Sequence, residues 1–188
     1  MFGLPLAVYL NPVYADSAGF GLSLGFVGLV LALSRVFDGV TDPVIGFLSD
    51  RMKTRWGRRR PFVLIGMPIF MLGVWLLWIP PIEFTEVTFL GMTFNTGYPY
   101  LLAVLVIMYI GATIKDVPYS AWGAELAQGY NERTLIMSWK EAFTVTGSLI
   151  GAMTPAVIVF WGYTKPTDNV YFLTIALVII MPILIFNM

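Results

Sequence analysis

The feature that most constrains this chain is a series of continuous apolar runs, each of a length suited to crossing a lipid bilayer. The run from Pro61 to Ile79 contains no charged residue, and about 20 apolar residues are enough for a membrane-spanning helix. Apolar residues make up 58% of the sequence and charged residues 12%, whereas soluble domains carry about 25% charged residues. The sequence therefore predicts an integral membrane protein.

The apolar runs predict six helical spans in a single bundle that covers residues 1–188. The expected spans are 2–14, 20–48, 61–79, 98–122, 135–161 and 170–188. The first is shorter than a full span, so we expect it to be incomplete and the chain to be part of a longer protein. Because the runs are continuous and do not alternate with polar residues, they favour an all-α membrane fold over a β-barrel.

Basic residues are concentrated in one connection between the spans. Residues 49–60 hold six of the eleven Lys and Arg residues, and residues 80–97 hold none. The positive-inside rule therefore places loops 49–60 and 123–134 in the cytoplasm and the 80–97 connection outside. We expect a multi-pass protein of the cell membrane (plasma or inner membrane) that contacts the lipid bilayer, with no nucleic-acid partner.

A cluster of charge interrupts the second span, where Arg35, Asp38 and Asp42 follow one another at spacings that share a helix face. Charged residues at membrane depth are costly and usually serve a function. The chain has no Cys and no His, so any cation or proton chemistry must use carboxylates. With hydroxyls from Thr41 or Thr113, the two acids would suit Na⁺, Li⁺ or a shared proton. The alternative is a structural Arg35–Asp38 ion pair.

The fourth and fifth spans carry further charges: Lys115, Asp116, Lys140 and Glu141. Together with the second span they sum to one net negative charge, which a bound cation would relieve. Tyr119 and Trp122 lie one turn apart and could stack on a sugar ring while Asp116 binds its hydroxyls. Alternatively, these aromatic residues only pack, and the charges of the fifth span only extend toward the membrane surface.

Three stretches of sequence resemble known transporters. The segment GFLSDRMKTRWGRRRP is similar to the loop signature of the major facilitator superfamily. The segments RVFDGVTDPVIG and IKDVPYSAWGAEL resemble the glycoside–pentoside–hexuronide:cation symporter family. The resemblance covers essentially the whole chain. It implies the six-helix N-terminal half of a twelve-helix fold, with the C-terminal six-helix half as its partner.

The resemblance also implies a function, namely Na⁺- or H⁺-coupled symport of a sugar or glycoside by alternating access, with the coupling cation and no other cofactor. Implied roles are cation binding by Asp38, Asp42, Thr41 and Thr113; substrate binding by Asp116, Tyr119, Trp122 and Lys140; and gating or structural support by Arg35, Asp50, Arg51, Gly57, Arg58 and Arg59. The chain departs from the family pattern near Phe2, where an acid is missing, and at Ser120, which replaces a tryptophan.

Other functions remain open at this point. The solute could be something other than a sugar. The acid pair could belong to a Mg²⁺-dependent membrane transferase, which would need a second acidic motif. A transporter-like scaffold or sensor is a further alternative. We expect a transporter and not an enzyme.

Overall fold

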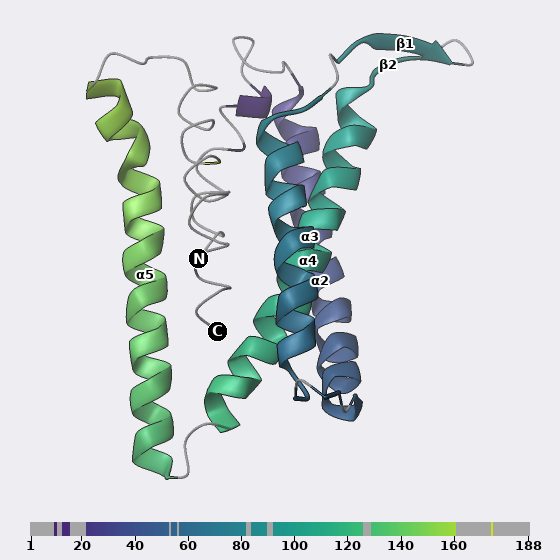
Figure 1. The fold of residues 1–188 in the computed structure, drawn as a ribbon. Helices are drawn as coiled ribbons and strands as arrows, with labels where there is room; N and C mark the ends of the chain where they lie inside the picture. Colours follow the sequence, from purple (N-terminus) through teal and green to yellow (C-terminus); the bar gives the residue numbers. More distant parts are fainter. Residues whose placement is uncertain are drawn as a thin grey trace.

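The computed structural model describes residues 10, 13–15, 22–52, 54–55, 57–81, 84–89, 92–125, 129–160 and 174. The elements in chain order are α2 (Leu24–Arg51), α3 (Arg60–Trp78), β1 (Glu86–Phe89), β2 (Met92–Asn95), α4 (Gly97–Glu125) and α5 (Tyr130–Phe160) (Figure 1). Most of the predicted spans 2–14 and 170–188 lies outside the described residues. The all-α membrane fold class is confirmed, and three helices in the described part, α2, α3 and most of α4, are long and apolar enough to cross a membrane.

The helix ends follow from local sequence signals. The side chain of Ser23 caps α2 by accepting a 3.2 Å hydrogen bond from the backbone N–H of Phe26, which satisfies one of the free donors of the first turn. For this reason α2 begins four residues after the start of the predicted span 20–48. Pro61 lies in the first turn of α3, where the missing N–H of a proline costs nothing.

Helices α3 and α4 pack backbone against backbone because glycines line their contact. A Cβ atom built on Gly73 would lie 2.6 Å from the Cα atom of Met108, and one on Gly66 would lie 2.7 Å from the amide nitrogen of Lys115. Gly111 of α4 is in similarly close contact with the backbone of Phe70. Small residues permit this approach of membrane helices, and the contact fixes the depth of Lys115 relative to α3.

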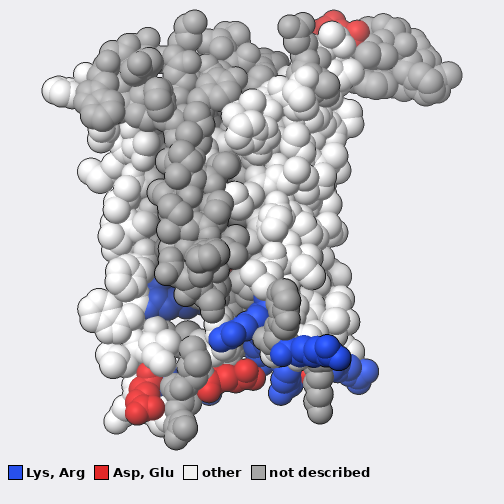
Figure 2. Space-filling model, viewed as in Figure 1, with Lys and Arg blue, Asp and Glu red and all other residues white. Residues whose placement is uncertain are grey.

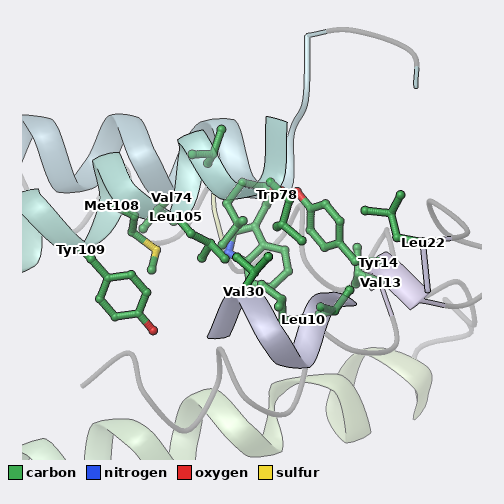
Figure 3. Packing of buried hydrophobic residues seen from close by; sticks show 14 of the residues in the cluster. Leu10, Val13, Tyr14, Leu22, Val30, Val74, Trp78, Leu105, Met108 and Tyr109 are labelled. Carbon is green, nitrogen blue, oxygen red and sulfur yellow. Dashed lines mark hydrogen bonds between the residues drawn. The ribbon is translucent and has the colours of Figure 1, made fainter. Parts of the chain in front are cut away.

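A buried apolar cluster fills the space between α2, α3 and α4 (Figure 3). Val30, Val74 and Leu105 contribute to it from these three helices. Tyr14 joins them from the N-terminal part and donates a hydrogen bond to the backbone carbonyl of Leu77. Tyr109 lies at one end of the cluster in this view, with its hydroxyl pointing away from the other side chains drawn.

The two ends of the bundle differ in charge. Strands β1 and β2 form an antiparallel hairpin, with Val87 opposite Phe94 and Thr88 opposite Thr93, at the end opposite to the α2–α3 connection (Figure 1). The hairpin forms because β-branched and aromatic residues dominate this part of the 80–97 connection. Figure 2 shows that the Lys and Arg side chains on this face gather at the other end, with the α2–α3 connection. By the positive-inside rule, that end faces the cytoplasm.

Candidate functional site

The charged face of α2 brings Arg35, Asp38 and Asp42 together. Asp38 is half-buried, while Arg35 and Asp42 are exposed in the described part of the protein. The i, i+3 and i+7 spacing places the three charged groups on one face of α2, with Arg35 and Asp42 about one turn on either side of Asp38. The Oδ1 atom of Asp38 is buried and makes no hydrogen bond within the described residues. A buried carboxylate oxygen in that position is costly unless something binds it.

Thr41 lies on the same face as the two acids. Its hydroxyl donates to the backbone carbonyl of Phe37 at 3.0 Å and is 3.4 Å from that of Asp38. The hydrogen atom is therefore directed into the helix backbone, and the oxygen keeps its lone pairs for another ligand. This geometry is compatible with the predicted role of Thr41 as an oxygen ligand of a cation.

Helix α4 supplies the other side of this region. Thr113 is buried, with 4% of its surface exposed, on the helix that packs against α2 near Gly46 and Val117. Tyr109 lies one turn earlier on α4, and the charges of Arg35 and Asp38 act on its hydroxyl. Sequence reasoning missed Tyr109, although its spacing to Thr113 is the helical i, i+4 interval that places two residues on one face.

Lys115 and Asp116 pair with each other. The Lys115 Nζ atom lies 2.5 Å from the Asp116 Oδ1 atom, and it also sits 4.6 Å from the ring centroid of Phe70 on α3. The lysine side chain is 13% exposed and the aspartate side chain 62%. Lys115 is thus enclosed between helices, whereas the Asp116 carboxylate is exposed in the described part of the chain.

The predicted substrate residues divide into two groups. On the α5 side, the Lys140 Nζ atom lies 2.6 Å from the Ser120 hydroxyl and 5.8 Å from the ring centroid of Tyr119. On the α3 side, the guanidinium of Arg60 lies 5.3 Å from the centroid of a Trp122 ring. Tyr119 and Lys140 therefore come together, whereas Trp122 contacts the basic end of α3.

The cytoplasmic end of the bundle is joined through Arg59. Its Nη2 atom lies 2.9 Å from the Asp50 carboxylate of α2 and 2.8 Å from the Glu125 carboxylate of α4. We call this three-residue unit the Arg59 clasp. Arg59 is buried, with 9% exposed, so its charge needs these partners. Sequence reasoning missed Glu125. Its position as the first acidic residue after the fourth apolar run could have identified it.

The other predicted gating residues surround the Arg59 clasp. Arg58 donates to the backbone carbonyl of Asp50 at 2.7 Å, whereas Arg51 stacks on Phe47 of its own helix at 4.0 Å. Gly57 has a φ of 100°, a left-handed conformation that favours glycine. This turn reverses the short connection so that Arg59 can reach both acids.

Replacing Arg59 by methionine is expected to destabilise the full-length transporter by about 1–3 kcal/mol, because two acids would face each other without their shared cation. The thermal unfolding midpoint in detergent would measure the effect. The matched control is Arg55→Met, since Arg55 is an exposed residue of the same connection. Equal midpoints for the two variants would contradict a stabilising Arg59 clasp.

The sequence is similar to those of known membrane transporters. The sequence matches a family model described as MFS/sugar transport protein over residues 1–188. It is 38% identical over 146 residues to a protein of Synechocystis sp. named uncharacterized symporter sll1374, covering 77% of this chain and 26% of the relative. It is 30% identical over 161 residues to the inner membrane symporter YicJ of Escherichia coli, covering 85% and 33%.

A vertebrate protein is also similar. The chain is 26% identical over 174 residues to the sodium-dependent lysophosphatidylcholine symporter 1 of Gallus gallus, covering 92% of this chain and 30% of the relative. The chain thus spans about a quarter to a third of the length of these relatives. All three relatives are named as symporters.

Proposed function

We propose that this chain, which belongs to the MFS/sugar transport protein family, is the N-terminal half of a transporter that couples movement of a small solute to a Na⁺ or H⁺ gradient. The observation that carries the proposal is the Asp38 carboxylate, which has a buried oxygen without a described hydrogen-bond partner beside the charge of Asp42. Two acids on one face of a membrane helix call for a cation or a proton.

In this mechanism the coupling cation binds between α2 and α4. Asp38 and Asp42 provide the charge, and Thr41 and Thr113 provide hydroxyl oxygens. The bound cation neutralises the pair and holds α2 against α4, which prepares the solute site. Because coupling free energy is reciprocal, bound solute must strengthen cation binding by the same factor.

The solute site proposed here is centred on Asp116, Tyr119 and Lys140. The exposed Asp116 carboxylate can accept hydrogen bonds from sugar hydroxyls, and the Tyr119 ring offers an apolar surface. Lys140 and Ser120, already 2.6 Å apart, add a charged and a neutral donor. Trp122 is also a proposed solute-binding residue. Its ring in addition contacts the guanidinium of Arg60 at the start of α3.

The Arg59 clasp is proposed as part of the cytoplasmic gate. It joins the inner ends of α2 and α4 through one buried guanidinium. Gly57, Arg51 and Arg58 shape the connection around it. Release of solute to the inside would follow rocking of this half against the other half of the transporter.

A second solute class is favoured by the similarity to a lysophosphatidylcholine symporter. Such a solute carries a phosphate group, and Lys140 supplies a positive charge whose described contacts are the Ser120 hydroxyl and the Tyr119 ring. In this version the same cation site drives the uptake of an amphiphile in place of a sugar.

Uptake into proteoliposomes containing the full-length transporter tests the proposal. A radiolabelled panel of glycosides, pentoses, hexuronides and lysophosphatidylcholine is offered with a Na⁺ gradient, with a pH gradient, or with neither. We expect one solute class to accumulate only when a gradient is imposed. Accumulation of lysophosphatidylcholine alone would select the second solute class, and gradient-independent equilibration of every solute would contradict symport.

A further inference from the structure

The phenol of Tyr109 lies in the charged region of the described structure, and neither the sequence nor the family resemblance assigns it a role. Its side chain packs against the apolar cluster, with 7% of the residue exposed. The hydroxyl is buried and makes no hydrogen bond within the residues that the structure describes. In Figure 3 it points away from the apolar side chains. A buried hydroxyl without a partner is costly, so its retention here calls for a ligand.

A second buried oxygen in the same state lies on the neighbouring helix. Asp38 Oδ1 of α2 is also buried and also lacks a hydrogen bond in the described part of the chain. The charges of Asp38 and Arg35 act on the Tyr109 hydroxyl, so this hydroxyl belongs to the same electrostatic unit as the acid pair. Two helices therefore each bring one unsatisfied oxygen to the same charged region.

The chemistry of these two atoms fits a metal cation. A hard metal cation binds several oxygens at once and accepts lone pairs from carboxylates and neutral oxygen ligands alike. A cation between α2 and α4 would thus satisfy both buried atoms together.

We infer that the Tyr109 hydroxyl oxygen is a ligand of the coupling cation, bound together with Asp38, and that this cation is Na⁺ or Li⁺. The inference rests on the proposed function and deepens it, because it adds a ligand from α4 and names the cation that this ligand would bind. Tyr109 and Thr113 then form the α4 wall of the site, opposite the acids of α2.

Binding of ²²Na⁺ to the purified full-length transporter tests the inference without knowledge of the solute. Tyr109→Phe keeps the ring and removes only the oxygen, and we expect its Kd for Na⁺ to rise by roughly 10–100-fold, as for other groups that support a metal site. The matched control is Tyr100→Phe on the same helix, whose hydroxyl donates to the Leu76 carbonyl at 2.7 Å. Its Kd for Na⁺ should equal that of the wild type.

Thermal unfolding separates a ligand from a structural hydroxyl. In Na⁺-free choline buffer, Tyr109→Phe should be at least as stable as the wild type, because it loses a hydroxyl that has no described partner. The rise in melting temperature on adding Na⁺, which reports binding to the folded state, should shrink in the variant. Equal loss of stability with and without Na⁺ would overturn the inference in favour of a structural role.

The outcomes for the two proposals are distinguishable. A wild-type Kd for Na⁺ in Tyr109→Phe, with gradient-driven uptake intact, would overturn only the role of Tyr109. A wild-type protein that binds no Na⁺ or Li⁺ but takes up solute on a pH gradient would also overturn this inference and leave proton symport standing. Absence of any gradient-driven uptake would overturn the proposed function and the inference together.

Discussion

Asp38→Asn in the full-length transporter is expected to abolish gradient-driven uptake, lowering the initial rate on the order of a hundredfold or more. The variant keeps the volume of the side chain but removes the negative charge that would hold the cation. Asp38 has a buried carboxylate oxygen with no hydrogen-bond partner among the described residues, so we expect an amide at this position to lose the bound cation. Initial uptake rates across a range of Na⁺ concentrations would measure the effect.

The matched control for this change is Glu86→Gln, which also converts a carboxylate to an amide. Glu86 is an exposed residue of β1 at the opposite end of the bundle, so its variant should transport at the wild-type rate. Equal thermal midpoints for the two variants would show that Asp38→Asn is folded. A folded Asp38→Asn that keeps most of the wild-type rate would refute the cation site on α2.

Gly111→Val is expected to have the largest effect on folding, with a loss of about 3 kcal/mol or more in the free energy of unfolding. The Cβ atom alone would overlap the backbone of α3 at Phe70, and backbone cannot move aside as a flexible side chain can. Separating α3 from α4 would also break the neighbouring contacts at Gly66 and Gly73. The yield of folded protein and the thermal midpoint in detergent are the measurements.

Gly28→Val serves as the control because a Cβ atom at Gly28 meets nothing within 4 Å in the described structure. It makes the same chemical change in a membrane helix without the close contact, and its midpoint should stay near that of the wild type. Equal losses of stability in both valine variants would contradict the α3–α4 contact as the cause, because valine has a higher helix propensity than glycine.

The membrane fold was readable from the sequence because it depends on local composition. The uncharged run that becomes α3 and the proline in its first turn are visible without any tertiary information. The shared face of Asp38 and Asp42 follows from helical periodicity in the same way. The capping of α2 by Ser23 depends on a finer local signal and altered only the boundary of that helix. The β1–β2 hairpin is an element within the 80–97 connection that the apolar runs did not predict.

The contacts between helices could not be read in this way. Tyr109 is one aromatic residue in a long apolar run, and only the packing of α4 on α2 brings its hydroxyl within electrostatic reach of Asp38 and Arg35. Glu125 likewise acquires its partner from a distant loop. The approach of Arg60 to Trp122 is another case, because sequence spacing alone gives the face of a helix but not its neighbour.

The glycine contact between α3 and α4 has a consequence for the order in which the protein is made. These two helices are consecutive in the chain, and only the short β1–β2 region separates them. Their contact needs no residue of α5, so it can form as soon as α4 has entered the bilayer, while later helices are still being synthesised. We therefore expect α3 and α4 to pack together before α5 is inserted, so that α5 then packs against an α3–α4 pair that has already formed.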